Sequence, residues 1–273
     1  MVRKGLRAGG AVVLVGVALM AVVVMVALGF AAAIGRRAVE ELPTPTAMHA
    51  SDLVQDTVIV DRMGRRIVAL ANGIEHREVV SLDRISPVLR DAIVASEDIR
   101  FWSHRGLDAR GIARALFTDL QHRGRMQGGS TITQQLLKLT LLHGRPSLLR
   151  KAEEALLASR FESVLTKEQL LELYANAAAF GDGNSGVEAA VQDMFGTSAA
   201  RVTTAEAALL AGAIHAPARS SPFCRATSVR KRQQHTLDRM VVAGFVSRDA
   251  ADAARTAPIS FRLADDRPSN DVV

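Results

Sequence analysis

The hydrophobic pattern of the chain begins with an uncharged apolar run from Ala11 to Ile34. At about 1.5 Å of rise per residue, a helix of this length can cross a bilayer hydrocarbon core about 30 Å thick. The run is longer than the apolar core of about 7–15 residues that is usual in a cleaved signal peptide. Basic residues cluster before it, at Arg3, Lys4 and Arg7. By the positive-inside rule we expect residues 1–10 in the cytoplasm, one transmembrane helix over 11–34, and the rest of the chain on the other side of the membrane.

The segment after this anchor predicts a linker and then short strands. Residues 35–56 include the Pro- and Thr-rich stretch ELPTPTAMHA, which favours an extended linker. Thr57–Asp61 and Arg66–Leu70 flank a turn that contains Gly64, which is typical of a β-hairpin. Glu78–Ser81 is expected to add a third strand.

Helical patterns dominate from Ser86 onward. Helices are expected over Pro87–Ala95, Ala109–His122, Ile132–Leu142, Ser147–Leu165, Lys167–Ala178 and Arg230–Ala243. Capping-box spacings occur at Thr131 and Gln134, at Thr166 and Gln169, and at Thr203 and Glu206. Residues 257–273 are expected to form a flexible tail. We therefore expect a mainly α domain over 57–256 with a few short N-terminal strands, preceded by one transmembrane helix.

Composition and charge narrow the class of protein. The 273 residues, 48% of them hydrophobic, can bury one sizeable core but not two large catalytic domains. The formal net charge of +6 would suit nucleic acid, but the basic residues are dispersed, and one Tyr and one Trp offer little base stacking, so no nucleic-acid partner is expected. The charge instead favours an anionic membrane surface and a diphosphate ligand. Cys224 is the only cysteine, so no internal disulfide can form.

The richest group of chemically useful side chains is the stretch SEDIRFWSHRGL, residues 96–107. Glu97 and Asp98 fall at the C-terminal end of the predicted helix, where the partial negative charge of the helix tends to raise a carboxyl pKa. Phe101 and Trp102 would strengthen this effect by excluding water. A carboxylate held in this way can act as a base. Taken alone, the stretch would equally suit a solvated salt-bridge loop over a buried Phe.

Two further stretches carry candidate ligands for an anion. In MQGGSTITQQLLK, two glycines precede a capped helix that carries Gln135 and Lys138, and a helix N-terminus of this kind suits an anion, although the same pattern is common in proteins that bind none. Farther along, Arg150 and Glu154 share a helix face beside Lys151. Alone, this second group would most simply be a solvated ion pair worth a few tenths of a kcal/mol.

Together these stretches resemble the motifs of the peptidoglycan glycosyltransferases (glycosyltransferase family 51), the polymerising domain of bifunctional penicillin-binding proteins and of stand-alone monofunctional enzymes. The stretches around Glu97 and Thr131 resemble the first two motifs, and Arg150, Lys151 and Glu154 resemble the third. LELYANAAAFGDGNSGVEAA resembles the fourth motif and EAALLAGAIHAP, more loosely, the fifth. The resemblance covers roughly residues 57–254 and implies a lysozyme-like helical fold with a large lobe and a smaller, membrane-facing one.

The chain departs from the family pattern at two positions. Leu139 follows Lys138 where the family usually has Asn, and Ala179 precedes Phe180 where an aromatic residue is usual. Neither change removes a carboxylate, but both bear on donor-site binding and turnover.

The resemblance implies transfer of a glycan held on undecaprenyl diphosphate to the 4-hydroxyl of the sugar on a second lipid-linked disaccharide peptide, lipid II. It makes Glu97 the base and Glu154 a second catalytic carboxylate, which orients cations, holds a divalent metal (Mg or Mn) or contacts the donor sugar. Residues expected to contact substrate or shape its site are Asp98, Phe101, His104, Thr131, Gln135, Lys138, Arg150 and Lys151. Of these, the cationic side chains of Lys138, Arg150 and Lys151 suit the diphosphate. Thr131 and Gln135 are expected to line the donor side, and His104 is expected to support its loop.

The resemblance also implies a location and partners. We expect a single-pass protein of the bacterial inner (cytoplasmic) membrane that binds lipid II and the growing glycan and works with transpeptidases and other cell-wall synthesis proteins. No Ser-x-x-Lys motif lies in a plausible second domain, which predicts a monofunctional polymerase, although the segment after Gly244 resembles the junction to a transpeptidase domain.

Two other functions stay open. A glycan-cleaving lysozyme-like enzyme also relies on a buried glutamate, but it has no diphosphate for a cation cluster to stabilise. A catalytically weak membrane scaffold of the wall-building machinery would fit the departures at Leu139 and Ala179.

Overall fold

The computed structural model describes residues 76–111, 129–142, 148–181, 183–214 and 226–262, the short segments 57–60, 62–63 and 66–70, and the single residues 22, 25, 49 and 53. The expected transmembrane helix over 11–34 and the linker over 35–56 lie outside them, apart from those single residues, and so does most of the helix expected over 109–122. In the described part of the chain, no helix is both long and apolar enough to cross a membrane.

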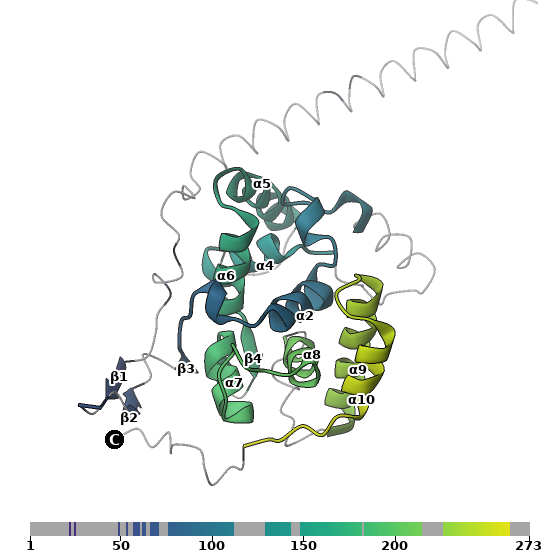
Figure 1. Cartoon of the computed structure of the whole chain (residues 1–273). Coiled ribbons are helices and arrows are strands. Elements are labelled where there is room, and N and C mark those ends of the chain that lie inside the picture. Colours follow the sequence, from purple (N-terminus) through teal and green to yellow (C-terminus); the bar gives the residue numbers. More distant parts are fainter. Residues whose placement is uncertain are drawn as a thin grey trace, which may run out of the picture.

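The described chain is mainly helical, as the sequence predicts, and α2 (Pro87–Glu97) lies at its centre (Figure 1). It packs against α8 (Thr204–Ala213) and α9 (Ala226–Val242) on one side and α6 (Lys167–Ala177) on the other. The remaining helical elements are η3 (Leu82–Arg84), η4 (Phe101–Ser103), α4 (Ile132–Thr140), α5 (Leu148–Val164), α7 (Val187–Phe195) and α10 (Arg248–Thr256).

Capping explains where several of these helices begin. Thr131, Thr166 and Thr203 each accept a hydrogen bond from the backbone N–H three residues later, and the Gln or Glu side chain at that position binds back to the backbone N–H of the threonine. Each box satisfies donors that a helix N-terminus would otherwise leave unpaired. The three predicted capping boxes are therefore confirmed.

The buried stripe of α2 carries Glu97 into the protein. Ser86 caps the helix, and Pro87 occupies its first turn, where no intrahelical N–H bond is lost. Leu89, Ile93 and Glu97 are spaced four residues apart, so they share one face, and all three are buried. Glu97 thus occupies a position that the pattern otherwise gives to an apolar residue.

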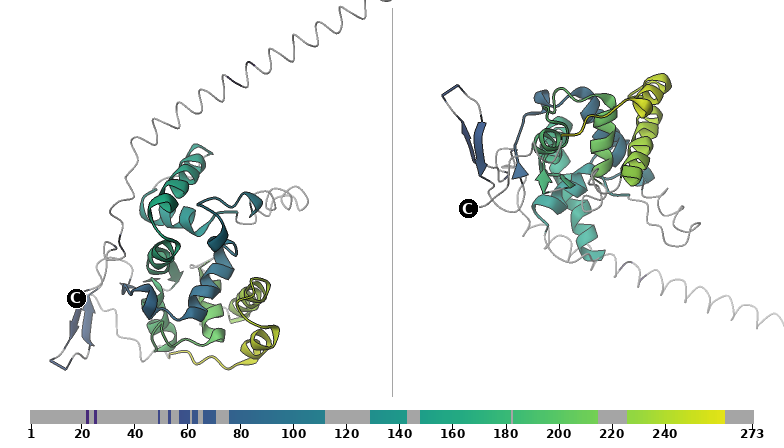
Figure 2. Two further views of the ribbon diagram at one scale, coloured as in Figure 1. Left: turned by 45° about the horizontal axis from the view of Figure 1, so that its top comes forward. Right: turned by 90° about the horizontal axis from the view of Figure 1, so that it is seen from below.

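The predicted hairpin is confirmed, but the prediction of a third strand over residues 78–81 is wrong. β1 (Thr57–Val60) pairs antiparallel with β2 (Arg66–Leu70), and this hairpin stands apart from the helices in both views of Figure 2. The next strand, β3 (His76–Arg77), instead pairs in parallel with β5 (Asn184–Ser185), which also pairs with β4 (Ala179–Gly181).

Residues 78–81 do not form a strand, and side chains of α6 bind the backbone at Val80 and at the following Leu82. The Asn176 amide accepts from the Val80 N–H at 2.9 Å and donates to the Val80 carbonyl at 2.8 Å. Glu172 Oε2 accepts from the Leu82 N–H at 2.7 Å. These bonds hold the segment beside α6 without a strand partner.

The folded part continues past the boundary expected at residue 256. The Arg262 N–H donates to the Met194 carbonyl at 2.9 Å, and the rings of Phe261 and Phe195 lie 6.0 Å apart. Residues 261 and 262 therefore contact α7, and residues 263–273 of the expected flexible tail lie outside the described chain.

Gly106 offers a test of how the loop after η4 meets α5. Its φ is +84°, and an added Cβ would lie 2.6 Å from backbone atoms of Ala158 and Ser159. Because the obstacle is helix backbone, Gly106→Ala should lower the free energy of unfolding by about 2–4 kcal/mol, measured by urea denaturation of the full chain in detergent.

Gly244 provides the matched control for this substitution. Its φ is +75°, but nothing lies within 4 Å of an added Cβ. Gly244→Ala should therefore show only the backbone strain of about 1 kcal/mol. Equal losses in the two variants would contradict the close approach of Gly106 to α5.

Candidate active site

Glu97, the last residue of α2, is bound by a side chain of α4. Gln135 Nε2 donates to Glu97 Oε2 at 2.7 Å. Gln135 lies on the first turn of α4, one turn after its cap, so the start of α4 lies against the end of α2. The carboxylate that the sequence predicts as a base is thus buried and held by a neutral hydrogen-bond donor.

Tyr174 of α6 supports Gln135 from the core. Its hydroxyl donates to Gln135 Oε1 at 3.2 Å, and its side chain is fully buried. Burial, and secondarily the negative charge of Glu97, raise the pKa of Tyr174 well above its ordinary value of 10.0. The hydroxyl therefore stays protonated and acts as a donor.

Asp98 joins three segments at the N-terminus of α4. It is the C-cap of α2, and its Oδ2 accepts from the Ile132 N–H at 3.2 Å and lies 2.8 Å from His104 Nε2. A carboxylate at a helix N-terminus is favoured by the helix dipole and by the unpaired N–H groups there. His104 thus joins its loop to the C-cap of α2, and its predicted place at the substrate site stays a prediction.

Thr131 and Phe101 are engaged within the protein. The Thr131 hydroxyl donates to the Gly106 carbonyl at 2.8 Å and accepts from the Gln134 N–H at 3.3 Å. Phe101 is fully buried, with Lys167 Nζ 4.3 Å from its ring centroid. Both side chains pack around the segment that follows α2, and their predicted contacts with substrate stay predictions.

The cations of α5 gather around a buried carboxylate. Glu154 Oε1 lies 3.7 Å from Arg150 Nε, and its Oε2 lies 2.8 Å from Lys151 Nζ. Arg150 also donates to the Leu142 carbonyl, just after α4. The predicted pair of Arg150 and Glu154 is thus confirmed, and Glu154 is buried in place of forming a solvated surface pair.

Lys151 connects this group to α4. Its Nζ donates to Ser130 Oγ at 2.8 Å, and Ser130 directly precedes the Thr131 cap. The side chain of Lys151 is half exposed, which leaves part of the ammonium open to solvent. The start of α4 therefore contacts the end of α2 through Glu97 and Asp98, and α5 through Lys151.

Lys138 lies farther along α4 than the other candidates. It is exposed in the last turn of the helix, and Leu139 beside it has 45% of its surface exposed. Its predicted role beside Arg150 and Lys151 stays a prediction.

Sequence reasoning missed two members of this network as site residues. The sequence places Tyr174 only within the stretch that resembles the fourth motif, and no motif residue draws attention to Ser130. The signal for Tyr174 is its spacing from Leu170 and Leu171 on the buried face of α6, which places a polar hydroxyl in the core. For Ser130 only its position before the cap was available.

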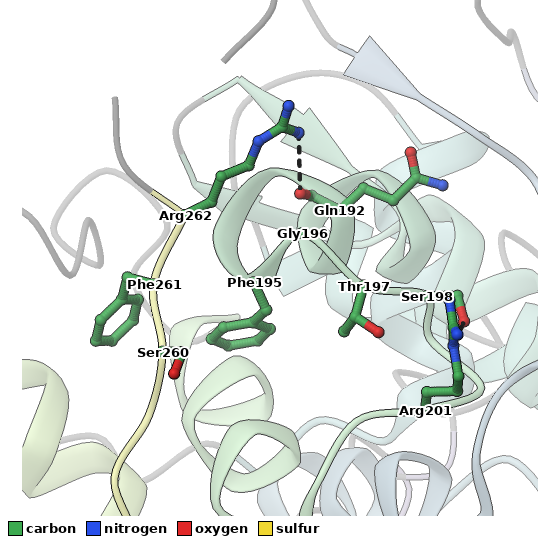
Figure 3. Close-up of a pocket in the computed structure, with 9 residues that line it drawn as sticks. All are labelled: Gln192, Phe195, Gly196, Thr197, Ser198, Arg201, Ser260, Phe261 and Arg262. Atoms are coloured by element: carbon green, nitrogen blue, oxygen red, sulfur yellow. Dashed lines mark hydrogen bonds between the residues drawn. The ribbon is translucent and has the colours of Figure 1, made fainter. Parts of the chain in front are cut away.

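A separate pocket lies at the end of α7, away from these residues (Figure 3). It has a volume of about 710 Å³ and is lined by Gln192, Phe195, Gly196, Thr197, Ser198, Arg201, Ser260, Phe261 and Arg262. Arg262 Nη1 donates to the Gln192 carbonyl at 3.5 Å across its edge. The lining includes none of the predicted site residues, and Figure 1 shows α7 and α5 at opposite ends of the helical body.

No group of three or more His, Cys, Asp or Glu side chains in the described part of the chain could hold a metal ion. The described site therefore offers a buried carboxylate with an amide donor, a second buried carboxylate, and the cations Arg150 and Lys151. Such a set can remove a proton at one point and stabilise developing negative charge at another.

Comparisons with known proteins agree with this chemistry. A family model described as Transglycosylase matches residues 64–241. The chain is 40% identical over 191 residues to penicillin-binding protein 1A of Rickettsia felis, covering 69% of this chain and 24% of that protein. It is 36% identical over 223 residues to penicillin-binding protein 1A of Aquifex aeolicus, covering 82% of this chain and 30% of that protein.

The chain thus spans between about a quarter and a third of the length of these relatives. Among solved structures, the crystal structure of penicillin-binding protein 1A from Haemophilus influenzae aligns with a TM-score of 0.45 and 23% identity, covering 77% of this chain and 21% of that one. The extent of the family match is decisive: the chain belongs to the transglycosylase family.

Proposed function

We propose that this protein is a membrane-anchored peptidoglycan glycosyltransferase that polymerises lipid II and releases undecaprenyl diphosphate. The observation that carries the proposal is the meeting of two kinds of group at the start of α4. A buried carboxylate, Glu97, is bound by Gln135, and the cation Lys151 is bound by Ser130. Membership of the transglycosylase family supports the same reaction class.

In this proposal Glu97 is the general base. It takes the proton of the 4-hydroxyl of the acceptor sugar as that oxygen attacks the anomeric carbon of the donor. The NH₂ group of Gln135 donates to Glu97 Oε2 and so fixes the orientation of the carboxylate. The other carboxylate oxygen then accepts the proton of the acceptor hydroxyl. The bond from the anomeric carbon to the diphosphate breaks, and the diphosphate leaves with the electron pair.

The cations stabilise this leaving group. Lys151 and Arg150 flank Glu154, which offsets their mutual repulsion and restricts their rotamers before substrate arrives. Lys138 adds a third positive charge from α4. Glu154 thus acts mainly by orienting cations, although direct contact with the donor sugar or with a divalent cation stays compatible with its position.

Anchoring would bring this site to its lipid substrates. The apolar segment 11–34 is long enough to span a bilayer, and its flanking charges favour a cytoplasmic N-terminus. The domain would then work on the outer side of the inner membrane, where transpeptidases and other wall-building proteins are the expected partners. A glycan-cleaving enzyme would have no use for the cations beside Glu154, which is why synthesis is the preferred reaction.

Glu97→Gln tests the base directly. Losing the proton acceptor should reduce glycan formation by about 10²–10⁴-fold, measured as labelled glycan ladders made by the purified full chain from lipid-linked disaccharide peptide. Glu168→Gln, an exposed carboxylate in the first turn of α6, is the matched control and should keep its activity. Near-normal synthesis by Glu97→Gln would contradict the proposal and favour a scaffold.

Glu154→Gln tests the carboxylate that organises the cations. Without its charge, Arg150 and Lys151 lose their anionic partner, and turnover should fall by about 10–100-fold in the same assay. Glu153→Gln, one residue earlier and outside these ion pairs, should change turnover by no more than about twofold. Equal effects of the two substitutions would remove any special role for Glu154.

Lys138→Ala tests the cation of α4. An exposed ammonium that binds a diphosphate should contribute mainly to substrate affinity, so the KM for the lipid-linked donor should rise by about tenfold. Lys231→Ala is the matched control, because it removes the same positive charge from an exposed lysine of α9. The assignment fails if both variants have the same KM.

A further inference from the structure

Tyr174, Gln135 and Glu97 form a chain of two hydrogen bonds across α6, α4 and α2. The Tyr174 hydroxyl donates to Gln135 Oε1 at 3.2 Å, and Gln135 Nε2 donates to Glu97 Oε2 at 2.7 Å. Among the contacts of the described residues, the tyrosine hydroxyl has no other hydrogen-bond partner. The proposed reaction uses no proton of this hydroxyl, so its place in the core calls for another role.

The Gln135 amide can complete this chain in two ways. When Glu97 is ionised, the NH₂ group faces the carboxylate, and the amide oxygen accepts from Tyr174. When Glu97 is protonated on its other oxygen, Oε2 is uncharged and accepts from the NH₂ group more weakly. A proton on Oε2 itself could be donated to the amide oxygen only if the amide turned over, and the NH₂ group would then face the tyrosine. In that second arrangement the tyrosine hydrogen loses its acceptor, which is unfavourable in the core.

We infer that Tyr174 is a positioning residue for the base, because through Gln135 it selects the ionised and oriented form of Glu97. The inference rests on the proposed function, in which Glu97 is the base. After Glu97 has taken the proton of the acceptor hydroxyl, the same chain favours release of that proton. Tyr174 thereby resets the base between successive transfers without touching substrate.

Other charged groups act on Glu97 by a different route. Asp98 follows it in sequence and is engaged by His104. From α9, Arg239 donates to the Ala95 carbonyl in the last turn of α2, which places positive charge at the negative end of that helix. None of these groups hydrogen-bonds to the amide of Gln135 among the described contacts.

The ionisable groups of α8 and α6 are engaged elsewhere or exposed. Glu206, the only ionisable residue within Thr204–Ala213, caps its own helix at Thr203. On α6, Lys167 pairs with Glu162, Glu172 accepts from the N–H of Leu82 at the start of η3, and Glu168 is exposed. These groups give a background field that substitution of Tyr174 leaves unchanged, so the substitution isolates the amide chain.

The first test uses the fact that Tyr174 is the only tyrosine of the chain. When the protein is labelled with ¹³Cζ-tyrosine and kept in detergent, its NMR spectrum contains one tyrosine resonance. The chemical shift of this resonance is measured between about pH 4 and pH 8. We expect one titration step, absent in Glu97→Gln and in Gln135→Leu. A resonance that does not move, or a step that survives Glu97→Gln, overturns the inference.

The second test is the pH dependence of glycan formation by Tyr174→Phe. Removing the hydroxyl lets the amide turn freely, so protonated Glu97 gains an acceptor and its pKa rises. Because the base works only when ionised, the acidic limb of kcat/KM should move by about half to one pH unit to higher pH. In the Gln135→Leu background, Tyr174→Phe should cause no further shift.

The outcomes separate a positioning role from packing. A loss of activity that is equal at every pH, with the limb unmoved, assigns Tyr174 to packing alone and overturns the inference. If Tyr174→Phe does not fold, the titration of the labelled wild-type chain still tests whether Tyr174 responds to Glu97. The resonance is recorded without substrate, so it tests the inference separately from the proposed function. A titration step in a protein that makes no glycan would support the link between Tyr174 and Glu97 and would contradict the proposed function.

Discussion

The contact on which the rest of the site depends is the Asp98 carboxylate at the N-terminus of α4. It accepts from the Ile132 N–H and lies 2.8 Å from His104 Nε2, and so joins the end of α2, the loop that follows it and the start of α4. The partial positive charge of a helix N-terminus makes a carboxylate a favourable partner there. With α4 held in this way, Gln135 comes within hydrogen-bond distance of Glu97, and Ser130 comes within reach of Lys151. One anchoring carboxylate thus helps to position both Glu97, the proposed base, and Lys151.

Burial of so many polar groups would be costly if they were not paired. The described site satisfies several of them by bonds between elements far apart in sequence, such as Tyr174 with Gln135 and Thr131 with the Gly106 carbonyl. Such networks restrict the side chains to few arrangements, which suits a site that must hold a reacting carboxylate in one orientation. The same feature makes the positions sensitive to conservative substitutions.

The sequence predicted the features that depend on local chemistry. The helix ends follow from caps such as Thr131 and Thr203, and the ion pair of Arg150 with Glu154 follows from their spacing. The contact of Gln135 with Glu97 joins residues 38 positions apart, and no local pattern specifies it. The strand expected at residues 78–81 failed for a related reason, because Asn176, almost a hundred residues away, replaces a strand partner at Val80. Non-local side-chain pairing therefore limits what sequence periodicity can predict.

The most direct test of the central claim is the stoichiometry of the reaction catalysed by the unmodified full-length protein. Labelled lipid-linked disaccharide peptide would be supplied in detergent, and glycan length and released undecaprenyl diphosphate would be measured together. A synthetic enzyme should release one lipid diphosphate for every disaccharide added to a lengthening glycan. Cleavage of preformed glycan without release of diphosphate, or no reaction by the folded protein, would contradict the account.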